Sequence, residues 1–173
     1  MVAWSPSGAD DKKATQWCPC GYLTDPRGRC RCPSTKVAAY LAKLSGPLLD
    51  RIDLHVEVPA LPFEALTQTP SGETSAHIRS RVLKAQRWRR RRGQQRTNAQ
   101  LSSKELKAYC EMTPEAVGLL RSAMRELTLS ARSYTKILKI SRTIADLAAS
   151  EEILPDHTAE AIQYRSLDRQ LWT

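Results

Sequence analysis

Residues 45–59 read Ser45-Gly-Pro-Leu-Leu-Asp-Arg-Ile-Asp-Leu-His-Val-Glu-Val-Pro59. From Leu54 to Val58 apolar and polar side chains alternate, and Pro59 then ends the run, which is the pattern of a short strand. Gly46-Pro47 opens the preceding stretch and indicates a turn or a short helix. The sequence therefore predicts one strand here, with helices on both sides of it.

Helical spacing of apolar residues dominates the rest of the chain. Ser34 is expected to cap a helix that runs to about Leu44. From Glu73 onward helical segments follow one another, and they are opened by Glu73, by the capping box of Ser102 and Glu105, by the cap and proline of Thr113-Pro114, by Ser130 and by Pro155. The chain is therefore predicted to be α+β and mostly α, with a helical bundle attached to the edge of a sheet.

Basic charge is concentrated in one segment. The 173 residues carry 27 Lys and Arg against 18 Asp and Glu, and nine of the basic residues, with no acidic one, lie between Arg79 and Arg96. Within this segment the run Arg87, Trp88, Arg89, Arg90, Arg91 and Arg92 can bind a phosphate backbone, with the indole stacking on a base. The alternative is a solvated helix end whose tryptophan packs against the bundle.

The compartment follows from what the sequence does not contain. No run of eighteen apolar residues occurs, and the first residues have neither the basic nor the apolar region of a secretory signal. We therefore expect a cytoplasmic protein without a membrane partner. Clustered cysteines in such a compartment stay reduced and favour a metal over a disulfide.

Four cysteines form two Cys-x-Cys pairs separated by nine residues: Cys18, Cys20, Cys30 and Cys32. Two thiolate pairs joined by a loop with glycine and proline can close a tetrahedral site, and four sulfurs with no open position suit a structural zinc ion. The alternative is a loop of free or oxidisable thiols. Cys110 stands alone in a predicted helix and is expected in the core.

Several motifs together resemble the magnesium-chelatase-like AAA+ ATPases of the ComM type. In chain order they are Cys18-Pro-Cys-Gly-Tyr22, Cys30-Arg-Cys32, the segment 45–59, Asn98-Ala-Gln-Leu-Ser102, Leu129-Ser-Ala-Arg132 and Ala161-Ile-Gln-Tyr-Arg-Ser-Leu-Asp-Arg169. The resemblance covers roughly residues 17–170. It implies a hexameric, ATP-driven motor for DNA branch migration in natural transformation, built from a RecA-like core and a helical lid.

The resemblance divides the chain into four parts. Residues 1–16 match nothing and are expected to be a disordered leader, 17–60 to be the C-terminal remnant of the AAA+ core with its cysteine loop, 61–72 a linker, and 73–170 the helical lid. No Gly-x-x-x-x-Gly-Lys-Ser/Thr motif occurs, and Gln16-Trp17 stands where the family has its Asn-Pro sensor. We therefore expect a truncated family member that does not hydrolyse ATP alone.

Roles for three arginines are implied by the same resemblance. Arg51 matches the arginine finger, which acts in trans on the γ-phosphate held by a neighbouring subunit; the alternative is a salt bridge with Asp50 or Asp53. Arg132 matches the second sensor, which contacts ATP in its own subunit, and Arg142 is a weaker candidate for that place. The alternative for Arg132 is a solvated basic face.

The implied partners are DNA and either neighbouring AAA+ subunits or the missing N-terminal half. Zinc is the expected structural cofactor, and ATP with magnesium belongs only to a complete family member. The rival hypothesis is a stand-alone basic module, stabilised by zinc, that binds nucleic acid and has no nucleotide role. Nothing in the sequence supports chelation of a porphyrin.

Overall fold

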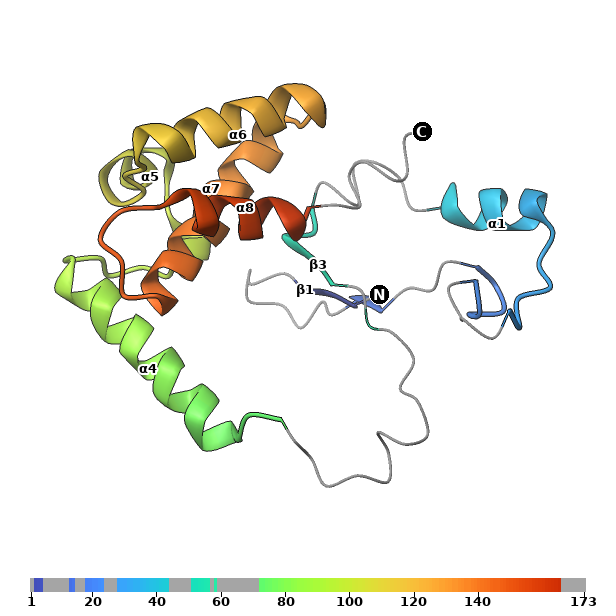
Figure 1. The fold of residues 1–173 in the computed structure, drawn as a ribbon, viewed down its shortest axis with the longest axis horizontal. Coiled ribbons are helices and arrows are strands. Elements are labelled where there is room, and N and C mark those ends of the chain that lie inside the picture. The colour runs from blue at the N-terminus through green and yellow to red at the C-terminus, as the bar shows by residue number, and fades with distance from the viewer. Residues whose placement is uncertain are drawn as a thin grey trace. The chain divides into compact units, whose positions relative to one another are not determined.

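The computed structural model describes residues 2–4, 13–14, 18–23, 28–43, 51–56, 58 and 72–165. The chain divides into two compact units, of which the first comprises Met1–Ser71 with Leu167–Thr173 and the second comprises Gly72–Ser166 (Figure 1). In the described part of the chain, every helix is too short or too polar to cross a membrane.

The first unit holds a small antiparallel sheet. Strand β1 (Val2–Trp4) lies between β2 (Lys13–Ala14) and β3 (Leu54–Val56), with Val2 opposite Val56 and Trp4 opposite Leu54. The strand predicted at Leu54 is confirmed, but two strands fall within residues 1–16, which we expected to be disordered. Strands of two or three residues are too short to produce a recognisable alternation, so the sequence pattern could not reveal them.

Helix α1 (Ser34–Leu41) follows the cysteine loop in the same unit. It begins one residue earlier than expected, because Pro33 occupies the cap position that we assigned to Ser34, and Ser34 is the first helical residue. The helix ends before the expected Leu44.

The second unit confirms the series of helices predicted from Glu73 onward. They are α4 (Ser75–Arg91), α5 (Ser103–Tyr109), α6 (Pro114–Glu126), α7 (Ala131–Leu147) and α8 (Pro155–Gln163), with the 3-10 turn η1 (Asn98–Gln100) before α5. Side-chain caps fix three of the starts, because Thr74, Thr113 and Ser130 each accept a hydrogen bond from the first turn. The capping box of Ser102 and Glu105 is also formed.

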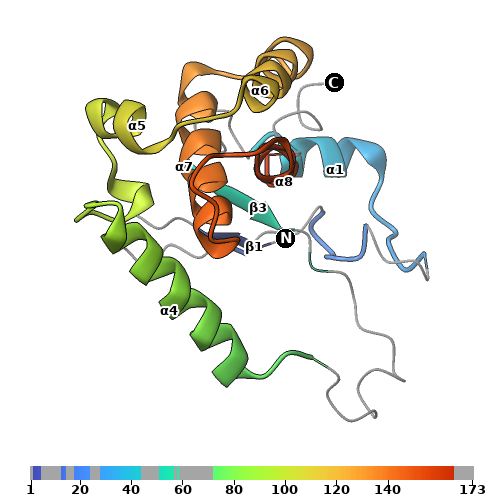
Figure 2. The same cartoon turned by 60° about the vertical axis from the view of Figure 1, so that its left-hand side comes forward.

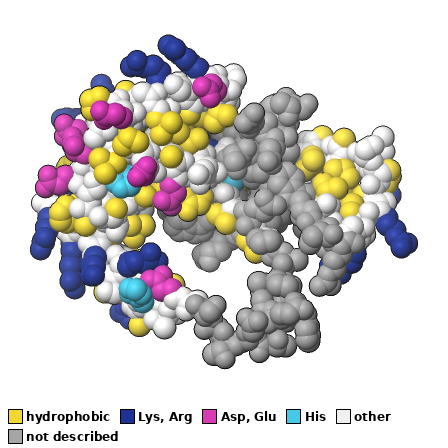
Figure 3. Space-filling model, in the orientation of Figure 1, with side chains coloured by type: hydrophobic (Ala, Val, Ile, Leu, Met, Phe, Trp, Pro, Cys, Tyr) yellow, Lys and Arg dark blue, Asp and Glu magenta, His cyan; other side chains and the backbone are white. Residues whose placement is uncertain are grey.

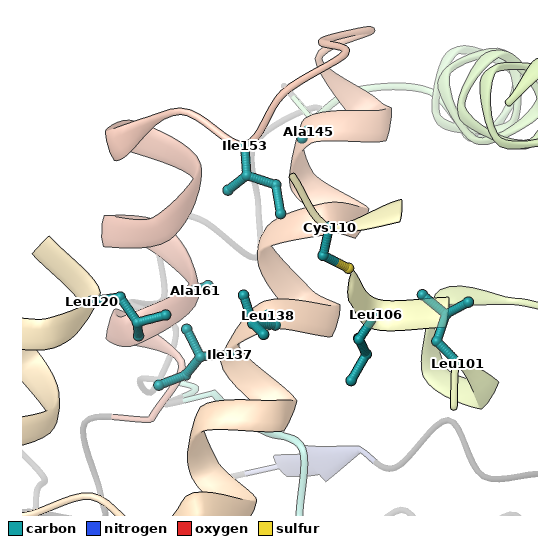
Figure 4. Packing of buried hydrophobic residues seen from close by; sticks show 9 residues of the cluster. All are labelled: Leu101, Leu106, Cys110, Leu120, Ile137, Leu138, Ala145, Ile153 and Ala161. Carbon is teal, nitrogen blue, oxygen red and sulfur yellow. The ribbon is translucent and has the colours of Figure 1, made fainter. Parts of the chain in front are cut away.

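Helix α7 is the centre of this unit. It packs against α4, α5, α8 and η1, and α6 packs on α8 (Figure 2). The core contains nine buried residues, drawn in Figure 4: Leu101, Leu106, Cys110, Leu120, Ile137, Leu138, Ala145, Ile153 and Ala161. Cys110 is thus in the core, as predicted.

The end of α7 is shaped by a residue in the left-handed region. Ala149 has φ 57°, and the Ser150 N–H returns to the Ala145 carbonyl at 2.9 Å. This sharp stop leaves the carbonyls of Ser150 and Glu151 pointing back at the helix, where side chains of α4 and α7 reach them. The turn therefore positions acceptors for the polar network described below.

Candidate functional sites

The cysteine loop of the first unit brings its four thiols together. The Gly21 N–H donates to the Cys18 carbonyl at 3.0 Å, and Gly21 and Gly28 have φ 79° and 63°, which side chains disfavour. These turns fold the loop back on itself. Sulfur atoms of Cys18, Cys20, Cys30 and Cys32 all lie within 4.8 Å of one another.

The sulfur separations fit a metal of tetrahedral coordination. Cys18 Sγ lies 3.2 Å from Cys20 Sγ and 3.7 Å from Cys30 Sγ, and the last two are 3.6 Å apart. A zinc ion with Zn–S bonds of about 2.3 Å requires sulfur–sulfur edges of about 3.8 Å, so only small shifts are needed. The four residues can therefore hold a metal ion, and their thiolate chemistry suits zinc.

The thiols influence one another strongly. Burial acts to raise the pKa of Cys18, but hydrogen bonds from Cys20 and Cys30 outweigh it and lower this pKa to about 6. A backbone hydrogen bond from Cys32 acts to lower the pKa of Cys30, yet burial and the neighbouring thiols raise it to about 12. One thiolate thus suppresses ionisation of another, and a bound cation would relieve this repulsion.

Arg51 lies in a turn directly before β3 and is exposed. Its side chain is therefore accessible to solvent in the first unit. Asp50, one of the two partners in the salt-bridge alternative, lies outside the described residues.

Arg132 is the second residue of α7 and is also exposed. The side chain of Ser130 caps this helix by accepting the Ser133 N–H at 3.1 Å. The backbone dipoles at the start of a helix add partial positive charge to that of the guanidinium. The start of α7 therefore combines two features that suit a phosphate group.

Arg142 differs completely from Arg132 in its surroundings. It has no exposed surface, and its guanidinium donates to Asp146 Oδ1 at 3.1 Å and to the Glu151 and Ser150 carbonyls. Burial lowers its pKa, and the charge of Asp146 opposes this shift. The side chain holds the turn after α7, so the weaker sensor candidate is a structural residue in this unit.

The basic run at the end of α4 separates into two sets. The Trp88 indole N–H donates to the Ser150 carbonyl at 3.2 Å, and Arg92 Nη1 pairs with Asp146 Oδ1 at 2.7 Å. Arg89 is half-buried, whereas Arg87, Arg90 and Arg91 are exposed. The run is therefore partly an anchor of α4 and partly an open surface.

The sequence analysis did not predict the buried polar network around Asp146. Asp146 also accepts from Asn98 Nδ2 at 2.8 Å, and Gln94 Nε2 donates to Asn98 Oδ1 at 2.8 Å. Asn98 stands in a motif that we had quoted for the resemblance only, and Asp146 lies four residues after Arg142 on α7. Opposite charges four residues apart on a helix are neighbours, so this spacing could have indicated the pairing of Arg142 with Asp146.

Comparison with known proteins agrees with these two units. Residues 72–165 match the family model described as magnesium chelatase, subunit ChlI C-terminal, and residues 12–66 match that of magnesium chelatase, subunit ChlI. The chain belongs to this magnesium-chelatase-like family.

Three relatives illustrate the similarity. The chain is 42% identical to competence protein ComM of Haemophilus influenzae over 88% of its own length and 30% of that protein. It is 40% identical to the uncharacterised protein YifB of Escherichia coli over 82% and 28% of the two lengths. For an uncharacterised protein of Mycobacterium tuberculosis the identity is 36%, over 86% and 29%. The chain thus spans about 30% of the length of these relatives.

Proposed function

We propose that this chain provides the C-terminal part of a ComM-type ATPase that acts as a ring on DNA. The single observation that carries the proposal is the contrast between two arginines of α7. Arg132 is exposed at a capped helix start, while Arg142 is wholly buried in the helix-end network. This difference in exposure supports Arg132, and not Arg142, as the residue that contacts a nucleotide.

Arg51 and Arg132 have complementary roles in this proposal. A guanidinium stays charged and donates two parallel hydrogen bonds, so Arg51 can stabilise the charge that builds on a γ-phosphate in a neighbouring subunit. Arg132 contacts the phosphates of its own subunit, and α7 connects that contact to the whole bundle. Residues outside this chain hold the phosphates and magnesium.

Zinc is the structural metal in this proposal. Four sulfurs leave no position for a substrate, so the ion shapes the loop and does no chemistry. Its contribution is to hold the four cysteines together ahead of α1.

A chimera tests the proposal. In it, this chain replaces the matching segment of the Haemophilus influenzae relative, and ATP hydrolysis is measured with DNA present. We expect hydrolysis in the chimera and a fall of about 10³-fold or more for Arg51→Ala. Lys36→Ala removes an exposed positive charge from α1 and serves as the control, with activity unchanged. Equal activity of the Arg51→Ala and Lys36→Ala chimeras contradicts the assignment.

The stand-alone nucleic-acid-binding module remains a second candidate. It is favoured by the compactness of Gly72–Ser166, which has its own core and a strongly basic helix. Under this alternative the chain binds DNA but its chimera shows no hydrolysis that depends on Arg51.

A further inference from the structure

Helix α4 has two different faces. At 100° per residue, Ala85, Trp88, Arg89 and Arg92 fall on one side. Those four residues are half-buried, whereas the other residues from Ser75 to Arg91 are exposed. The helix therefore rests on the bundle through its C-terminal half along a single line of side chains.

That inner line is held by specific bonds. Trp88 donates to the Ser150 carbonyl and Arg92 donates to Asp146, so both residues link α4 to the end of α7. The Nε of Arg89 is buried as well. Trp88, Arg89 and Arg92 therefore pack against the helical bundle. The Trp88 indole N–H is already hydrogen-bonded within the protein.

The opposite face carries five exposed basic residues: Arg79, Lys84, Arg87, Arg90 and Arg91. They lie within about 140° of the helix circumference and along about 18 Å of its axis. A hollow on this face is lined by Arg79, Lys84 and Arg87, among others. Figure 3 shows Lys and Arg side chains gathered over α4. We name these five residues the outer basic face.

We propose that the outer basic face binds the phosphate backbone of DNA without reading its sequence. From Thr74 to Lys104 the chain has no acidic residue, so nothing in this segment offsets the attraction. An 18 Å stretch matches about five base pairs, whose two strands present about ten phosphates. The choice of DNA as the ligand rests on the proposed function, whereas the presence of the outer basic face follows from the geometry of α4.

An acidic protein is the less suitable partner. Centres of protein interfaces are depleted in charged residues and depend on buried aromatic or aliphatic anchors. Leu83 is the one large apolar side chain among the residues that line the hollow, which also include Arg79, Lys84 and Arg87. Uniform charge on long side chains suits phosphates, which such residues neutralise with release of counterions.

Two charge-matched variants of the full chain test the proposal. The first carries Arg79→Gln, Arg87→Gln, Arg90→Gln and Arg91→Gln. The second carries Lys104→Gln, Lys107→Gln, Arg121→Gln and Arg125→Gln, which removes the same charge from exposed positions of α5 and α6. Affinity for a labelled 30-base-pair duplex is measured between 50 and 200 mM salt, and circular dichroism shows that both variants are folded.

Wild type should lose about 500-fold in affinity across this range, the expectation for five phosphate contacts. In a plot of the logarithm of the binding constant against the logarithm of the salt concentration, the slope of the outer-face variant should be smaller in magnitude by about 3.6. The second variant should keep the wild-type slope. Equal losses in both variants, or no loss in the first, overturn the proposal. Displacement of the duplex by polyglutamate as effectively as by unlabelled DNA also overturns it and indicates an acidic protein partner.

This experiment contains no nucleotide, so its failure is separate from failure of the proposed function. A chimera with Arg51-dependent hydrolysis but an outer face that does not bind DNA contradicts only the DNA surface. Binding through α4 without hydrolysis in the chimera contradicts only the ATPase assignment.

Discussion

Arg92, which caps the C-terminal end of α4, and Asp146 of α7 form a bidentate ion pair across 54 residues of sequence, with Nη1–Oδ1 and Nη2–Oδ2 distances of 2.7 and 3.2 Å. The same carboxylate accepts from Asn98 and Arg142. One aspartate therefore joins α4, η1 and α7, and its carboxylate provides a counter-charge to the fully buried Arg142.

Asp146→Asn should destabilise the second unit by about 3–5 kcal/mol. The change keeps the shape of the side chain but leaves the buried Arg142 guanidinium without its counter-charge, and breaking one side of a buried pair has this cost. Denaturant unfolding followed by circular dichroism measures it. Glu126→Gln removes a charge from an exposed site at the end of α6, and its effect should stay within about 0.5 kcal/mol.

Sequence reasoning succeeded where the cause of a structure is local. The helix starts at Ser102 and Thr113-Pro114 follow from side chains that bond backbone groups within three residues. The hub at Asp146 could not be found in this way, because two of its partners, Arg92 and Asn98, lie 54 and 48 residues away. Only tertiary packing brings them together.

The candidate sites show the same division. Residue type and spacing identified the four cysteines as a candidate metal site. The turns at Gly21 and Gly28 fold the loop so that the four sulfur atoms lie close together. The basic run was recognised as a whole, but its separation into inner and outer residues depends on which side of α4 meets α7. The side of α4 that faces α7 is set by the packing of the bundle, and the sequence periodicity of α4 alone does not reveal it.

Stability of the second unit should fall as the pH drops below about 6.5. His157 is buried, and burial together with the charge of Arg142 lowers its pKa, against the opposing effect of Asp156 and Glu160. Its Nδ1 accepts the Leu154 N–H at 3.1 Å, so this nitrogen is neutral in the fold. Below the pKa of the unfolded state, near 6.5, the unfolded chain binds the proton more readily, which favours unfolding.

His157 binds a single proton, so it can change the free energy of unfolding by at most about 1.4 kcal/mol per pH unit. Unfolding free energies from pH 7.5 to 5.5 measure it, and His157→Gln should remove the histidine-dependent part. His77→Gln, at a largely exposed position of α4, is the matched control and should retain the slope. An unchanged slope in His157→Gln would show that another group is responsible.

One zinc ion should bind per chain, and Cys18→Ser should abolish this binding at neutral pH. The change removes the buried thiolate from a four-sulfur site, which cannot close with three sulfurs and a weak hydroxyl. Elemental analysis and competition with a chelator report the stoichiometry. Cys110→Ser is the control, because Cys110 lies in the core of the second unit and the metal content should not change. Loss of zinc in both variants, or no zinc in wild type, contradicts this assignment.

The last prediction separates the two exposed arginines by the subunit on which each acts. In the chimeric ring, Arg51→Ala should leave ATP binding nearly intact and lower hydrolysis, because a finger acts on charge that develops during phosphoryl transfer. Arg132→Ala should change nucleotide affinity, since the second sensor contacts bound ATP in its own subunit. Fluorescent-nucleotide titration and steady-state hydrolysis distinguish these effects.

Mixed rings then assign each arginine to one side of the interface. A phosphate-loop mutant with an intact Arg51 cannot hydrolyse ATP, but it can offer its arginine to the functional nucleotide site of an Arg51→Ala neighbour. Mixing these two inactive proteins should therefore restore part of the activity. The same phosphate-loop mutant should not rescue Arg132→Ala, because the defect lies within the subunit that binds the nucleotide. Rescue of the Arg132→Ala ring alone would show that the two roles are reversed.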